Sequence, residues 1–158
     1  MGVYTTIRAS VRVDTNLVTL FERMYKFRTE NPWLDFYYEA KKQEYLPYTV
    51  LQNIRDWADE PRSGSIPFSF SGLSSIEGWE DRSFFDSNSS TWSFTCSLNH
   101  SGEVVTTFIE TVLVFIVNEC YELLVCYDDS TEVTEYIVDI TNRHVKVNKT
   151  FPLQSENE

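Results

Sequence analysis

The chain has 158 residues, of which 42% are hydrophobic, 15% aromatic and 23% charged. This composition excludes an unfolded chain and predicts a single domain over residues 1–153, followed by a frayed polar tail at 154–158. Thirteen Lys and Arg stand against twenty-four Asp and Glu, which gives a net charge of −11. That balance argues against sequence-independent nucleic-acid binding, in which basic side chains must neutralise phosphates, and favours docking on a basic partner.

The N-terminus has no apolar signal segment, and the longest strongly apolar run, 112–117, is far shorter than the roughly 20 residues that span a bilayer. Three cysteines, Cys96, Cys120 and Cys126, form no Cys-x-x-Cys pair, and an odd number suits a reducing compartment. We therefore expect a cytoplasmic protein.

Hydrophobic periodicity predicts the elements of the first half of the chain. Strict alternation predicts a strand over 3–13, and apolar residues at helical spacing predict a helix that begins after Asp14. A further helix, which Asn31 before Pro32 can cap, is expected at 33–45, and another after Pro47. Together these predict one strand followed by a helical layer.

A serine-rich segment at 63–97 follows, in which helical periodicity disappears. Within it, 66–70 alternates as a short edge strand, since it contains a proline. Residues 74–90 combine acidic and aromatic side chains and are predicted to form a long loop, a type of segment that often carries function.

The C-terminal half is predicted to contain a strand at 92–98, a buried helix at 103–117, and strands at 121–127, 133–140 and 143–147. The whole order predicts an α+β fold. We expect a ferredoxin-like antiparallel sheet with helices packed on one face, elaborated by extra helices after the first strand and by a C-terminal hairpin.

The sequence shows no catalytic constellation. His100 and His144 belong to no phosphoesterase or metalloprotease motif, and no serine elbow or phosphate-binding glycine loop occurs. The Asp128-Asp129 pair lacks the ligand spacing of a calcium loop and is better explained as a hairpin turn. We expect no catalytic residue, no metal and no cofactor.

Two acidic surfaces are therefore the candidates for partner binding. The first is the loop at 78–86, with Trp79 and Phe84 as aromatic anchors and Glu80, Asp81 and Asp86 as charged contacts. The second is the hairpin that carries Asp128, Asp129, Glu132 and Glu135. Trp79 has two possible roles: it either pins the loop to the core or anchors a partner.

Small size, acidity, high aromatic content and ferredoxin-like order together resemble accessory proteins encoded by bacteriophages, among them anti-CRISPR and anti-restriction proteins. The resemblance covers general character without a shared motif, so no functional residue is carried over. It implies a non-enzymatic inhibitor, in the cytoplasm of a bacterial host, that occludes a basic, nucleic-acid-handling defence protein. Immunity proteins that neutralise toxins share the same character.

The competing hypothesis is a small-ligand binding protein or an enzyme with a pocket beside the serine-rich segment. A nucleotide would stack there on Trp79 or Trp92 and accept hydrogen bonds from serines or from Arg8 and Arg12, which share one strand face.

Overall fold

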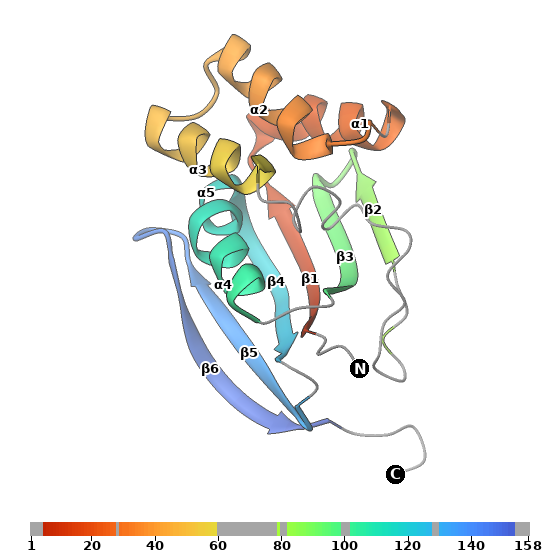
Figure 1. Ribbon diagram of the computed structural model, residues 1–158, viewed down its shortest axis with the longest axis vertical. Coiled ribbons are helices and arrows are strands. Elements are labelled where there is room, and N and C mark those ends of the chain that lie inside the picture. Colours follow the sequence, from red (N-terminus) through yellow and green to blue (C-terminus); the bar gives the residue numbers. More distant parts are fainter. Residues whose placement is uncertain are drawn as a thin grey trace.

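A computed structural model describes residues 5–27, 29–59, 79, 82–98, 102–127 and 130–153. They form the predicted α+β fold, built on a six-stranded sheet in which every pair of neighbouring strands is antiparallel (Figure 1). The strands are β1 (Thr5–Val13), β2 (Arg82–Asp86), β3 (Thr91–Leu98), β4 (Val117–Cys126), β5 (Glu132–Asp139) and β6 (His144–Pro152). Their order across the sheet is β2-β3-β1-β4-β5-β6.

The helices fall into two groups. After a short 3₁₀ turn η1 (Thr15–Leu17), α1 (Val18–Phe27), α2 (Pro32–Gln43) and α3 (Tyr48–Asp59) follow in sequence. The second group is one continuous helical stretch of α4 (Gly102–Phe108), a π turn η2 (Ile109–Leu113) and α5 (Val114–Ile116). Figure 1 shows α1, α2 and α3 as a layer at one end of the sheet, with α4 and α5 beside β4. No helix among the described residues is long and apolar enough to cross a membrane.

An aromatic core joins both helical groups to the sheet. Trp92 of β3 lies 4.8 Å from Phe21 of α1 and 6.0 Å from Trp33 of α2, measured between ring centroids. Phe108 of α4 in turn lies 5.7 Å from Trp33 and 5.0 Å from Trp57 of α3. Aromatic pairs of this kind contribute about 0.5–1.5 kcal/mol each beyond the area that they bury. The core therefore fixes α3 and α4 relative to each other.

Side-chain caps confirm two of the predicted helical starts in the first half, at η1 and at α2. The Asp14 carboxylate accepts a hydrogen bond from the Asn16 amide at 2.9 Å, and Asn31 accepts one from the Leu34 amide at 3.2 Å. These side chains satisfy amides that a helix leaves without an internal partner. Asn31 also donates to the Ala58 carbonyl at 3.0 Å, which ties the start of α2 to the end of α3.

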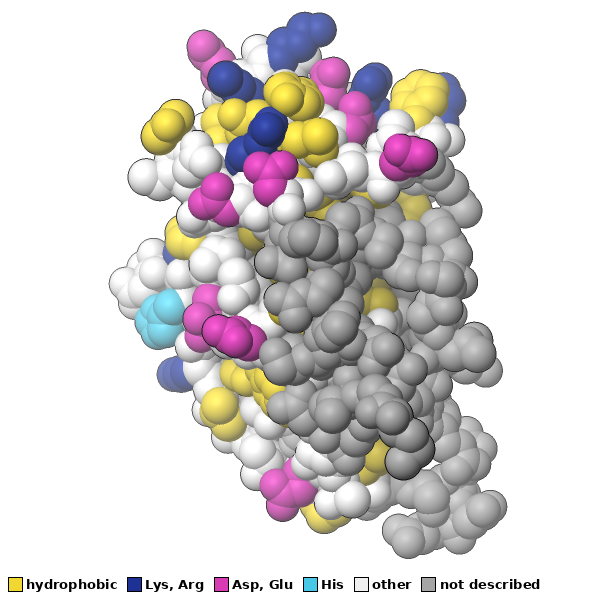
Figure 2. Space-filling view, in the orientation of Figure 1, with side chains coloured by type: hydrophobic (Ala, Val, Ile, Leu, Met, Phe, Trp, Pro, Cys, Tyr) yellow, Lys and Arg dark blue, Asp and Glu magenta, His cyan; other side chains and the backbone are white. Residues whose placement is uncertain are grey.

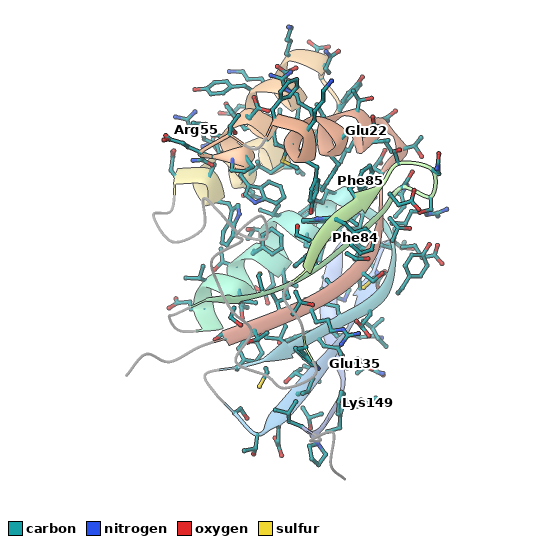
Figure 3. The ribbon with its side chains drawn as sticks, turned by 90° about the vertical axis from the view of Figure 1, so that its right-hand side faces the viewer. Glu22, Arg55, Phe84, Phe85, Glu135 and Lys149 are labelled. Carbon is teal, nitrogen blue, oxygen red and sulfur yellow. The ribbon has the colours of Figure 1, made fainter. Side chains whose placement is uncertain are left out.

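The loop predicted over 74–90 is wrong at its centre, because residues 82–86 form β2 and pair with β3. Phe85 stacks on Phe21 of α1 at 5.4 Å, while its neighbour Phe84 stands on the other face of the strand and is half exposed. Figure 3 labels both residues, with Phe85 nearer to the helical layer than Phe84. The strand predicted at 66–70 lies outside the described residues.

The remaining boundaries also shift. Helix and strand meet at Val117, so β4 begins earlier than predicted, and β6 continues to Pro152 beyond the predicted end. The ferredoxin-like topology is not confirmed, since the order of the six strands, β2-β3-β1-β4-β5-β6, is not the usual one.

Candidate functional site

The net negative charge of the chain comes entirely from its second part, residues 60–158. Residues 1–59 contain eight Lys and Arg and eight Asp and Glu, so their charges cancel. Residues 60–158 contain five Lys and Arg and sixteen Asp and Glu, which gives −11. The carboxylates of this second part must therefore be sorted into those used within the fold and those that face solvent.

Two carboxylates of β4 are used on the sheet. Arg8 of β1 donates from Nε to Glu122 at 2.9 Å, and Arg12 lies 3.6 Å from Glu119. On the other side of β1, the hydroxyls of Ser10 and of Ser93 in β3 form a hydrogen bond of 3.2 Å. This polar face of the sheet is thus largely satisfied by its own residues.

Trp79 lies against this polar face. The Arg8 guanidinium is 5.9 Å from the centroid of the Trp79 ring, which is a cation–π contact, and Trp79 is half-buried. Arg8 is thereby held between an aromatic ring and the Glu122 carboxylate. The contact favours the role in which Trp79 pins its segment to the sheet.

The other described members of the two predicted surfaces do not come together. Phe84 and Asp86 lie on β2, where Asp86 accepts from the Asn88 amide and so closes a turn. Glu132 and Glu135 lie on β5, where Glu135 accepts from Asn148 of β6 at 2.6 Å. Three strands separate β2 from β5, roughly 19 Å at the usual strand spacing. Figure 3 shows Phe84 and Glu135 at different levels of the sheet. Four further predicted contacts, Glu80, Asp81, Asp128 and Asp129, lie outside the described residues.

The nucleotide hypothesis loses one of its two stacking residues. Trp92 is fully buried in the core, and its indole N–H donates to the Tyr25 hydroxyl at 2.7 Å. A ligand therefore has no access to that ring. Arg8 and Arg12 do share a face of β1, as predicted, but each lies beside a carboxylate.

The Cys120 thiol is not activated for nucleophilic chemistry. Burial raises the pKa of Cys120 to about 11, so the sulfur is protonated at neutral pH. Among the described residues, no three His, Cys, Asp or Glu side chains gather as a metal site.

Two solvent-facing carboxylates line a cleft between α3 and α4, which has a volume of about 370 Å³. Buried Trp57 and Val104 form its apolar floor, and the exposed carboxylates of Asp56 and Glu103 stand at its rim. The remaining described lining residues are polar: Asn53, Thr107 and Thr111. We call this feature the acidic cleft.

The π turn η2 shapes one wall of the acidic cleft. It inserts an extra residue into the helical stretch, and Thr111 donates to the Thr107 carbonyl at 2.6 Å. Both threonines therefore line the same wall. Such π turns occur frequently at functional sites in helices.

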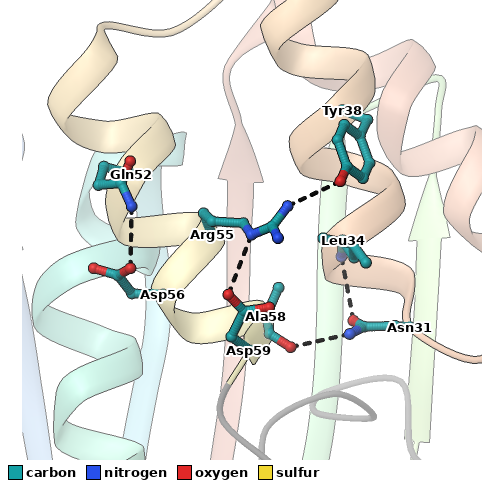
Figure 4. Close-up of polar contacts among 8 residues, drawn as sticks. All are labelled: Asn31, Leu34, Tyr38, Gln52, Arg55, Asp56, Ala58 and Asp59. Atoms are coloured by element: carbon teal, nitrogen blue, oxygen red, sulfur yellow. Dashed lines mark hydrogen bonds and ion pairs between the residues drawn. The ribbon is translucent and has the colours of Figure 1, made fainter.

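The position of Asp56 lowers the stability of helix α3. It lies in the last turn of α3, which contains no basic residue in that turn, and a carboxylate there opposes the helix dipole. Asp59 is compensated by Arg55 at 3.2 Å, whereas Asp56 accepts a neutral hydrogen bond from Gln52 at 3.1 Å (Figure 4). Stability alone does not account for a charge at Asp56.

Sequence reasoning missed the acidic cleft because its two carboxylates are 47 positions apart and share no motif. The packing of Trp57 against Phe108 helps to bring their helices together. The available signal was the acidic C-terminal turn of a predicted helix, which is unfavourable without a function.

No protein-family model, curated protein or solved structure matches this chain. The function is therefore argued from the acidic cleft and the distribution of charge.

Proposed function

We propose that the protein is a phage-encoded, non-enzymatic inhibitor that acts in the cytoplasm of a bacterial host and occludes a basic, nucleic-acid-handling defence protein. The observation that carries this proposal is the acidic cleft. Two exposed carboxylates, Asp56 and Glu103, stand over an apolar floor in a space of about 370 Å³.

This arrangement suits an arginine or lysine side chain of a partner. The apolar stem of such a side chain would pack along the floor at Val104, while its charged head would meet the two carboxylates. Hydrogen bonds to charged groups contribute about 1.5–3 kcal/mol each, enough for one inserted side chain to dominate an interface.

The distribution of charge supports the same proposal at long range. The −11 of residues 60–158 would attract a basic protein and speed the encounter. Basic grooves that bind nucleic acid carry the matching charge, so an acidic protein would compete for them.

We also propose that β2, β3, β1 and β4 with their helices represent a ferredoxin-like unit, to which β5 and β6 are added. The order of these four strands and their antiparallel pairing support it.

The test is protection of a phage from bacterial defence. Cells that carry a restriction or CRISPR system are challenged with a sensitive phage, with and without this chain. The wild-type chain should restore plaque formation, and the isolated defence protein should bind it more weakly as salt rises. Asp56→Asn with Glu103→Gln should weaken that binding about tenfold or more, because charged hydrogen bonds are lost.

Glu30→Gln with Glu44→Gln is the matched control, since it removes two exposed carboxylates from the neutral part of the chain. Full binding by the cleft variant would place the binding surface elsewhere. A wild-type chain that protects against no nucleic-acid-handling system would contradict the proposed inhibition.

A further inference from the structure

The helical layer exposes large aromatic side chains on its outer surface. Tyr48 at the start of α3 is 77% exposed, and Tyr38 of α2 is 53% exposed. Phe27 of α1 and Tyr45, between α2 and α3, are also exposed. Figure 2 shows hydrophobic side chains gathered over the helical layer at the top of the view, with both signs of charge around them. We call this surface the tyrosine face.

Part of the tyrosine face is held rigid. The Arg55 guanidinium stacks 5.4 Å from the Tyr37 ring and 5.7 Å from the Tyr38 ring, and donates to the Tyr38 hydroxyl at 3.0 Å. Its Nε also donates to Asp59 at 3.2 Å (Figure 4). Side chains fixed in this way lose little further entropy when a partner covers them. Tyrosine and arginine are the residue types that most often dominate interface energies.

The tyrosine face also contains a concave part. A cleft of about 310 Å³ lies between α1 and α2, with Phe27 and Tyr45 among its lining residues. Its walls carry both signs of charge, from Glu22, Arg23, Lys26 and Glu39. Tyr48, the most exposed aromatic side chain among the described residues, and this cleft thus offer a projection and a hollow on one helical layer.

A surface with a projection, a hollow and both signs of charge is self-complementary. A two-fold dimer requires this property, because each copy presents the same patch to the other.

The distribution of net charge along the chain indicates which partner covers the tyrosine face. Residues 60–158 carry the whole net charge of −11, so contact between two copies through that part would bring like charges together. Residues 1–59, which include the whole tyrosine face, sum to zero. The helical layer is the part through which two copies can meet without that repulsion.

We propose that the tyrosine face binds a second copy of this chain, forming a two-fold dimer in which Tyr48 of each copy packs into the α1–α2 cleft of the other. Arg55 and Asp56 leave α3 in different directions (Figure 4), so the acidic cleft is a separate surface from this contact.

Sedimentation velocity of the full chain over micromolar to millimolar concentrations tests the dimer. We expect a monomer–dimer equilibrium that shifts toward the dimer as salt rises, because salt screens the repulsion between the acidic parts. This is the opposite of the salt response expected for a basic partner, so the two proposals fail separately. Tyr48→Asp should weaken dimerisation by about tenfold or more, since a tyrosine at the centre of an interface contributes about 2 kcal/mol.

Tyr121→Asp is the matched control, because Tyr121 is 55% exposed but lies on β4, away from the helical layer. Circular dichroism and the melting temperature verify that both variants fold. A dimer that persists in Tyr48→Asp, or one lost in Tyr121→Asp, would overturn the proposal. So would a chain that stays monomeric at millimolar concentration and high salt.

Discussion

A single arginine in the β5–β6 turn connects the hairpin to the helix that precedes β4. Arg143 has a left-handed backbone (φ 53°), and its Nη1 donates to the carbonyls of Val114 at 3.1 Å and Val117 at 2.6 Å. Val114 belongs to α5 and Val117 is the residue that caps its C-terminus, where helical carbonyls lack amide partners within the helix. A cation at a helix C-terminus is also favoured by the helix dipole.

We predict that Arg143→Met lowers the free energy of unfolding by about 2 kcal/mol, because two charged hydrogen bonds and a dipole interaction are lost. Arg143→Lys keeps the charge but loses the forked set of N–H donors, so its free energy of unfolding should lie between those of the wild type and Arg143→Met. Urea denaturation measures the difference. A variant as stable as the wild type would show that the arginine does not cap the helix in solution.

A half-buried tyrosine pair makes stability depend on alkaline pH. Tyr136 of β5 shares a hydrogen bond of 2.6 Å with Tyr127, whose hydroxyl is 3.1 Å from that of Thr106 in α4. Burial, followed by the hydrogen bond to Tyr127, raises the pKa of Tyr136 above its ordinary value. The folded state thus holds this proton more tightly than the unfolded chain does. The resulting stability is fully present below the unfolded pKa of about 10 and is lost as pH rises toward the folded pKa.

We expect the melting temperature of the wild type to fall steeply between about pH 9 and about pH 11, and that of Tyr136→Phe to fall less, since phenylalanine does not ionise. Tyr121→Phe removes a hydroxyl from an exposed side chain and serves as the control. Equal slopes for all three proteins would mean that Tyr136 does not control the alkaline limb.

At the scale of elements, helix α3 has a conflict between stability and the proposed binding. Asp56 opposes the dipole at the end of the helix, and its described partner is the neutral Gln52. We predict that Asp56→Asn raises the free energy of unfolding by about 0.5 kcal/mol while it weakens binding of a basic partner. Thermal denaturation and the binding assay measure the two effects on one protein.

Asp59→Asn is the control for that prediction. It lies in the same helical turn but loses an ion pair with Arg55, so no comparable gain is expected. A destabilised Asp56→Asn would show that the carboxylate has a structural role.

The sequence predicted the longer helices and strands, whose hydrophobic periodicity and capping residues are local features. The alternation of β1, the helical start that Asp14 caps and the cap of α2 at Asn31 are all confirmed, because periodicity and capping act over a few residues. It missed β2, a strand of five residues in which two adjacent phenylalanines hide the alternation. That strand is defined by its pairing with β3, which is a tertiary fact.

The candidate site was less predictable than the fold for the same reason. The acidic cleft depends on how α3 packs against α4, and the contact of Trp79 with Arg8 depends on how distant parts of the chain meet. The sequence shows which side chains are acidic or aromatic, but it does not show the angle at which two helices pack.

For the whole molecule, the strongest asymmetry is between a neutral N-terminal part and an acidic remainder. The helical layer belongs to the first part, and the acidic cleft lies at the boundary, with Asp56 from the first and Glu103 from the second. The charge that would steer a basic partner and the surface that would join two copies are therefore built from different segments. The two proposed associations respond to salt in opposite directions as a consequence.

The attachment of the C-terminal hairpin leads to a prediction for the whole fold. Along the described residues, β5 pairs with β4 at Leu124–Glu135 and Val125–Thr134, whereas β1 pairs along nearly its full length with β3 and β4. Figure 1 shows β5 and β6 extending from the side of the sheet. Since few ladder hydrogen bonds hold the hairpin, we expect it to open as a unit at a lower free energy than the central strands.

Native-state hydrogen exchange should show β5 and β6 amides exchanging earlier than those of β1 as denaturant is raised. Arg143→Met should accelerate exchange in the hairpin further than in β1, because it removes the contact to α5. If hairpin and β1 amides share one opening free energy in both proteins, the hairpin unfolds with the rest of the chain.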